Sequence, residues 1–225
     1  MAKAWMPGVE RIDGGRDRTV AGVGAPRAVW TVTGSDPHVW SATDEARRLI
    51  HEGRTAHLVW NPVSGEIVQL LAATRRAGMP LGGAGTEGHR RDPGDEGRVC
   101  VVVAVVGTEK EPFTGGPMVG RSAILDWLDS WEVSRRWPAG PPGRQGAEGA
   151  ETAESARVWS RGGHFGHDQV PGATSTAPGR ISPERVLSEG DGPTGPRAAE
   201  QGPGALTDDA RVSRTHHGPR PSVIT

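Results

Sequence analysis

The most constraining feature of the sequence is a short apolar run at residues 98–106 (RVCVVVAVV), in which one arginine precedes eight apolar residues. A valine-rich run of this length is typical of a β-strand that is covered on both faces, and it falls well below the roughly 18 apolar residues of a membrane span. Strands covered on both faces belong to sheets that lie between helices. The run therefore predicts a central strand with Cys100 buried in it.

Shorter patterns predict the elements around that strand. Strands are expected at 27–33 (RAVWTVT), 56–61 (AHLVWN) and 66–71 (EIVQLL), the last two joined by a turn at 62–65. Helices are expected at 41–51, where Ser41 can cap the first turn, at 120–131 and at 154–160. Strands interleaved with helices predict the α/β class, with a central mixed β-sheet flanked by helices.

Composition limits how much of the chain can join this core. Glycine and proline number 34 and 19 of 225 residues. Valine, leucine, isoleucine and phenylalanine together make up about 17% of the chain, below the roughly 20% that marks disorder-prone sequences. All eight tryptophans lie at or before Trp159. We expect one folded domain over 1–188, with loops or linkers at 82–97 and 139–154, and a disordered Gly/Pro-rich tail over 189–225.

Charge and hydropathy exclude several classes of function. The formal net charge is -1 and the sequence pI is about 6.7, so there is no electrostatic case for a nucleic-acid partner. No apolar run is long enough for a membrane span, and no signal peptide is visible, which predicts a cytoplasmic protein. The oligomeric state is left open.

Six segments, taken in order, resemble one protein family. They are APRAVW (25–30), AHLVWNPVSGEIVQLL (56–71), GRVCVVVAVVG (97–107), WLDSWEVSRRWPAGPP (127–142), GGHFGHDQVP (162–171) and the Pro-Gly pair at 178–179. Together they resemble a zinc-dependent N-acetylmuramoyl-L-alanine amidase domain of the endolysin type found in actinomycetes and their phages. The resemblance extends over residues 7–188.

The resemblance implies an amidase-type fold with a zinc groove on one face of a mixed sheet. It implies a hydrolase that cuts the amide between the lactyl group of muramic acid and L-alanine of the stem peptide. Peptidoglycan or its muropeptide fragments would be the partner. Zinc held by three protein ligands would lower the pKa of a bound water and polarise the carbonyl group. A phage endolysin needs no signal peptide, because a holin releases it to the cell wall.

Matching the family's functional positions one at a time gives one metal ligand, His167, within its GHxxVP-type pattern. Thr31 stands where the first histidine ligand is expected, and Ala177 stands where the third ligand precedes the Pro-Gly pair. Ala104 takes the place of the assisting glutamate at the end of the central strand. We therefore expect the family activity to be impaired or absent, and zinc binding to be doubtful.

Other side chains offer weaker candidates. A site rebuilt from His57, His167 and a carboxylate is one alternative; the other is that His57 lies at the edge of the core and bonds to the backbone. His164 lies three residues before His167, and on a strand these two would face opposite sides. The simpler interpretation of His164 is a loop residue that packs near Phe165. Trp137, on a loop, is a candidate for lining a glycan groove.

Three functions remain open from the sequence. The first is a peptidoglycan amidase that uses zinc. The second is a non-catalytic peptidoglycan-binding pseudoenzyme that keeps the groove. The third is a decayed reading frame with no selected function. Whether the chain is an enzyme is therefore not decided by its sequence.

Overall fold

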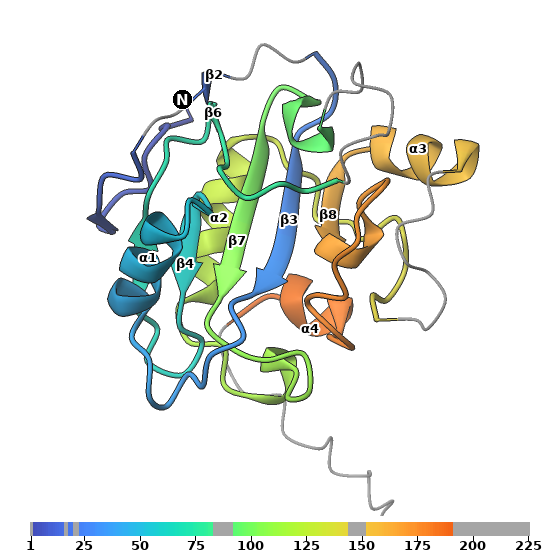
Figure 1. Ribbon diagram of the computed structural model, residues 1–225. Coiled ribbons are helices and arrows are strands. Elements are labelled where there is room, and N and C mark those ends of the chain that lie inside the picture. Colours follow the sequence, from blue (N-terminus) through green and yellow to red (C-terminus); the bar gives the residue numbers. More distant parts are fainter. Residues whose placement is uncertain (1, 16–17, 20–22, 83–91, 144–151, 191–225) are drawn as a thin grey trace, which may run out of the picture. The chain divides into compact units, whose positions relative to one another are not determined.

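The apolar run at residues 98–106 forms an inner strand of a six-stranded sheet, β7 (Cys100–Val105). This strand pairs in parallel with β3 (Arg27–Val32) on one side and with β4 (Leu58–Trp60) on the other. Every residue of β7 and of β3 is buried. The prediction of a central strand covered on both faces, with Cys100 buried, is confirmed (Figure 1).

The computed structural model describes residues 2–15, 18–19, 23–82, 92–143 and 152–190. The disordered tail predicted over 189–225 lies outside these residues except for its first two positions. Most of the predicted 82–97 loop and half of the predicted 139–154 linker also lie outside them. The predicted domain boundary at 188 stays a prediction.

The sheet is mixed, with the strand order β1-β5-β4-β7-β3-β8. The neighbours β4 and β5 (Ile67–Gln69) are antiparallel, as the predicted turn at 62–65 requires, and the other neighbouring pairs are parallel. The outer strands are β1 (Glu10–Arg11) and β8 (Gly163–Gly166). A separate antiparallel pair joins β2 (Arg18–Thr19) to β6 (Arg75–Arg76).

Two helices cover opposite faces of the sheet. Successive side chains of a strand point to opposite faces, so β3 and β7 each supply two cores. The helix α1 (Ala42–His51) packs with Val29 and Val102 on one face. The helix α2 (Arg121–Ser130) packs with Trp30 and Val103 on the other face. Figure 1 shows α1 in front of the sheet and α2 behind it. The predicted α/β class is confirmed.

Shorter helical segments complete the fold. They are α3 (Ala153–Ser160), α4 (Pro183–Leu187) and the 3₁₀ turns η1 (Pro93–Asp95), η2 (Phe113–Gly115) and η3 (His167–Gln169). Within the described ranges, no helix combines the length and the apolar character that crossing a membrane would require.

The start of α1 follows from two side chains. Ser41, the predicted cap, accepts a hydrogen bond from the backbone N–H of Asp44 at 2.9 Å. The carboxylate of Glu66, which directly precedes β5, accepts from the backbone N–H groups of Ala42 at 2.9 Å and Thr43 at 3.1 Å. These N–H groups have no partner within the helix, so Glu66 attaches α1 to the β4–β5 hairpin.

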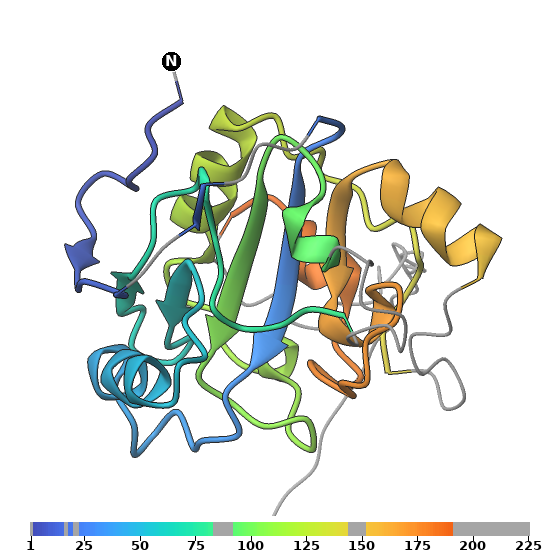
Figure 2. The same cartoon turned by 45° about the horizontal axis from the view of Figure 1, so that its top comes forward.

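The segment after β6 determines where a cavity can form. Residues 77–82 cross the α1 face of the sheet, running over β7 and β3 towards β8 in both views (Figures 1 and 2). Leu81 and Met79 in this segment are buried in the α1-side core. The carbonyl group of Leu81 thereby comes next to η3, which follows β8 directly.

Candidate functional site

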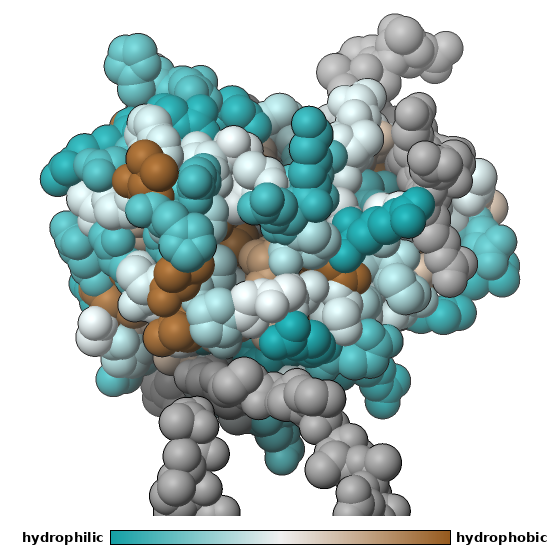
Figure 3. Space-filling model, turned by 90° about the horizontal axis from the view of Figure 1, so that it is seen from below, coloured by the Kyte–Doolittle hydropathy of each residue, from teal (hydrophilic) through white to brown (hydrophobic). Residues whose placement is uncertain are grey.

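A cavity of about 290 Å³ lies at the carboxyl end of β3. The carboxyl ends of parallel strands are the usual place for ligand sites in α/β sheets. Figure 3 views the molecule from the end at which β3 and β7 finish, and the surface there is largely hydrophilic. The cavity, called the groove below, is lined by Thr31, Val32, Arg54, Met79, Pro80, Leu81, Gly82, Glu109, His167, Thr174, Ser175 and Ala177.

The ring of His167 bonds to the protein through both of its nitrogens. Its Nε2 lies 3.2 Å from the backbone carbonyl oxygen of Leu81, and its Nδ1 lies 3.4 Å from the hydroxyl of Thr31. A carbonyl oxygen only accepts, so Nε2 carries the proton and Nδ1 accepts from Thr31. Burial lowers the pKa of His167 below its usual value, which favours the neutral ring.

Ala177 lies beside this pair in the groove and contributes only a methyl group as side chain. Its backbone carbonyl accepts from the N–H of Asp168 at 2.8 Å, which holds the segment before Pro178 against η3. The carboxylate of Asp168 accepts from the N–H of Gly143 at 2.6 Å. Burial raises the pKa of Asp168 to about 6.

Ala104 lies next to Thr31 across the β3–β7 ladder but does not line the groove. Its side chain is fully buried in the core beneath α1. A glutamate at this position would therefore have to displace core packing on the α1 side of the sheet.

His57 is not among the groove residues, and it is fully buried. Its Nδ1 accepts from the backbone N–H of Val102 at 2.9 Å, and its Nε2 donates to the carbonyl oxygen of Arg75 at 2.8 Å. Burial lowers the pKa of His57 to about 4. This matches the interpretation of a core histidine that bonds to the backbone, with both ring nitrogens in use.

His164 lies on β8 and not on a loop, so that part of the prediction is wrong. The Gly-rich sequence around it obscured a strand that pairs with β3, opposite Ala28. Its ring stacks between those of Trp30 and Trp137, at centroid distances of 6.0 and 6.2 Å. The indole N–H of Trp30 donates to Nδ1 of His164 at 3.0 Å. Burial lowers the pKa of His164 to about 4.

Trp137 packs against the α2-side core, and its indole N–H donates to the side-chain oxygen of Gln169 at 2.7 Å. It does not line the groove. His164 and Trp137 thus belong to the opposite side of β8 from Phe165, whose ring packs in the α1-side core. The structure brings Thr31, His167 and Ala177 together in the groove, and His57, His164, Ala104 and Trp137 do not line it.

Sequence reasoning missed two charged residues of the groove, Arg54 and Glu109. Arg54 follows the end of α1 and also pairs with Glu52 at 3.4 Å. Glu109 follows the end of β7, and its position after a parallel strand is the one signal that could have indicated it. A cation and a carboxylate at one groove suit a ligand that carries both charges.

Metal ligands are sparse in this region. Across the parts of the chain that the structure describes, no group of three or more His, Cys, Asp and Glu side chains is arranged to hold a metal ion. Of the three ligand positions that the resemblance implies, only His167 offers an imidazole, carboxylate or thiolate to zinc.

No family model matches the chain, and no curated protein matches it. Solved structures do match. The Ph2119 endolysin, from a bacteriophage of Thermus scotoductus, is 16% identical with a TM-score of 0.41, over 76% of this chain and 86% of that chain. An AmpD derivative is 16% identical with a TM-score of 0.42, over 80% and 92%.

The hydrolase AmiA of Staphylococcus aureus, solved in complex with its ligand, is 14% identical with a TM-score of 0.42, over 72% of this chain and 66% of that chain. At identities of 14–16% and TM-scores of 0.41–0.42, these likenesses carry no argument about this chain. The chemistry must be argued from the residues of this chain.

Proposed function

We propose that this chain is an amidase-like protein that binds peptidoglycan fragments in the groove without hydrolysing them. The observation that carries the proposal is the pairing of His167 with Thr31 and with the Leu81 carbonyl group. With Nε2 donating to Leu81, the ring has one lone pair left, on Nδ1, and this lone pair faces the Thr31 hydroxyl at 3.4 Å instead of a second metal ligand. Its role is therefore to shape one wall of the groove.

The donors at the groove do not fit the three-ligand zinc site that the resemblance implies. Thr31 offers a neutral hydroxyl, which is a poor zinc ligand, and Ala177 offers no ligand atom. Catalytic zinc sites need three protein ligands and an open position for water. The proposal therefore assigns no step to zinc.

Binding remains chemically reasonable because the groove is polar. The hydroxyl groups of Thr174 and Ser175 and the side chains of Arg54 and Glu109 line it. Muropeptides carry amides, carboxylates and, in many stem peptides, free amines. Arg54 would bind a carboxylate through charge-assisted hydrogen bonds, and Glu109 would bind an amine.

Isothermal titration of the full chain with N-acetylmuramoyl-L-alanyl-D-isoglutamine tests the proposal. We expect saturable binding that weakens about tenfold in Arg54→Gln, the equivalent of about 1.4 kcal/mol. The control is Arg157→Gln, an exposed arginine on α3 that does not line the groove and should bind as the wild type does. Chromatography of the incubated ligand should show no cleavage.

Two results would overturn the proposal. One tight equivalent of zinc per chain, lost in His167→Ala and accompanied by release of the peptide from muramic acid, would restore the amidase function. Absence of binding at millimolar ligand by a folded chain would instead favour a decayed reading frame.

A further inference from the structure

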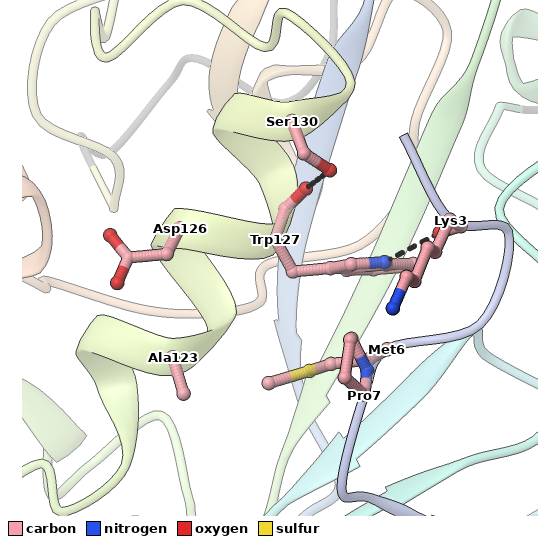
Figure 4. Close-up of a pocket in the computed structure, with 7 residues that line it drawn as sticks. All are labelled: Lys3, Met6, Pro7, Ala123, Asp126, Trp127 and Ser130. Carbon is pink, nitrogen blue, oxygen red and sulfur yellow. Dashed lines mark hydrogen bonds between the residues drawn. The ribbon is translucent and has the colours of Figure 1, made fainter. Parts of the chain in front are cut away.

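A second cavity, of about 330 Å³, lies between the N-terminal segment and α2 (Figure 4). It shares no residue with the groove and belongs to the opposite side of the sheet, since Met6 and Trp127 are part of the α2-side core. Its volume lies within the range of small-molecule sites. It is lined by Lys3, Met6, Pro7, Ala123, Asp126, Trp127 and Ser130.

The walls of this cavity are held in place by specific hydrogen bonds. The carbonyl oxygen of Lys3 accepts from the indole N–H groups of Trp127 at 2.9 Å and Trp131 at 3.2 Å. The side-chain oxygen of Gln69 on β5 accepts from the N–H of Met6 at 2.6 Å. The N-terminal segment is thus attached to both α2 and the sheet. A cavity whose walls are fixed before binding costs a ligand little ordering entropy.

The interior of the cavity is apolar. Pro7 and Ala123 are exposed and form its accessible apolar walls, while Met6 and Trp127, which are 3% and 4% exposed, lie beneath them in the core (Figure 4). Two polar groups of the walls are already in use, because the indole N–H of Trp127 donates to the Lys3 carbonyl oxygen and the hydroxyl of Ser130 donates to the Trp127 carbonyl oxygen at 2.6 Å. Such walls disfavour a sugar or a peptide, whose polar groups would lose water without gaining partners. They favour a flat hydrocarbon ring.

The charge at the rim points to an anionic ligand. The ammonium group of Lys3 reaches over the cavity beside Trp127 in Figure 4, and it forms no ion pair with any residue in the described ranges. Asp126, the other charged residue of the rim, points away from the Trp127 ring and pairs with Arg135 at 3.0 Å. The Lys3 ammonium is therefore the charge available to a ligand.

We propose that this cavity binds a small aromatic carboxylate. The ring would lie over Pro7 and Ala123, with Met6 and Trp127 beneath them, and the carboxylate would pair with the Lys3 ammonium at the rim. The apolar ring of such a ligand would contact the apolar walls of the cavity, and its one anionic group would fix the orientation of the ligand. Nothing in this proposal depends on the function of the groove.

Titration of the full chain with 2-naphthoate, followed by chemical shifts of the tryptophan indole N–H groups, tests the site. We expect saturable shifts of the Trp127 resonance, assigned with Trp127→Phe. Lys3→Gln should weaken binding about tenfold and remove most of its dependence on salt. Ala123→Leu, at an exposed position of α2, should fill the cavity and abolish binding without unfolding the chain.

Lys110→Gln is the matched control, because Lys110 is exposed and outside the cavity, and it should bind as the wild type does. Arg54→Gln should also leave 2-naphthoate binding unchanged, which separates this site from the groove. The proposal is wrong if the Trp127 resonance does not shift up to the solubility limit of the probe. Equal affinity in wild type, Lys3→Gln and Ala123→Leu would equally overturn it.

Discussion

The hydroxyl of Thr31 lies 3.4 Å from Nδ1 of His167, at the carboxyl ends of two neighbouring strands. Thr31 is on β3, while His167 directly follows β8, which pairs with β3 in parallel. Their side chains therefore meet at the carboxyl ends of both strands. The Leu81 carbonyl group completes the arrangement by fixing the tautomer in which Nδ1 accepts.

Thr31→Val tests this pair. Valine keeps the shape of threonine but removes the hydroxyl, so the buried Nδ1 of His167 loses its partner. We expect the free energy of unfolding to fall by about 1 kcal/mol, measured by urea denaturation. The control is Thr33→Val, because the hydroxyl of Thr33 is buried and has no hydrogen-bond partner among the described residues, so its removal should leave stability unchanged or slightly raised. Equal effects of the two substitutions would contradict the pairing.

The central elements of the fold were predictable because their signals are local. The valine-rich strand, the helix capped by Ser41 and the hairpin turn at 62–65 each follow from periodicity or turn chemistry within a dozen residues. The strand β8 was not clearly predictable, because its sequence GHFG is rich in glycine. Pairing with β3, from far along the chain, makes it a strand.

The groove residues also divide into those that could be predicted from the sequence and those that could not. Thr31, His167 and Ala177 could be placed together only through the resemblance, since no local pattern links residues so far apart. Arg54 and Glu109 could not be assigned, because both lie in connections whose course depends on the packing of α1 and β7. The stacking of His164 between two tryptophans likewise needs the assembled sheet.

Stability should fall in mild acid because of the buried histidines. The pKa values of His57 and His164 are about 4 in the folded chain, below the ordinary value of about 6.5 in an unfolded one. Between these values the unfolded chain binds more protons, so the free energy of unfolding rises with pH. Each histidine contributes at most about 1.4 kcal/mol per pH unit.

In His57→Gln the free energy of unfolding should rise less steeply with pH between pH 4.5 and 6.5. Part of the rise should remain, because His164 is still present. The measurement is urea denaturation at a series of pH values. His51→Gln serves as the control, because His51 is exposed at the end of α1. This variant should show the same slope as the wild type. A His57→Gln slope equal to that of the wild type would contradict the buried neutral ring.

Asp168 should have the opposite effect on the pH dependence of the free energy of unfolding, over nearly the same pH range. Burial raises its pKa to about 6, above the 3.8 of a free aspartate. Between these values the folded chain binds more protons than the unfolded one, so this residue lowers the free energy of unfolding as pH rises. The stability of Asp168→Asn relative to the wild type should therefore increase from pH 4 to pH 6. Glu154→Gln, at an exposed position on α3, should show no such trend.

Glu66 should stabilise the junction between α1 and the β4–β5 hairpin. Its carboxylate accepts from the backbone N–H groups of Ala42 and Thr43 and from the Thr43 hydroxyl, at 2.9, 3.1 and 2.7 Å. It also places a negative charge at the positive end of the helix dipole. Glu66→Ala should lower the free energy of unfolding by about 1–2 kcal/mol in urea denaturation. Glu66→Gln, which keeps an acceptor but no charge, should lower it by less.

Glu154→Ala, in the first turn of α3, is the control, because the carboxylate of Glu154 lies at a helix start but is exposed. If Glu66→Ala costs no more than Glu154→Ala, the stability of α1 depends on Ser41 and core packing alone.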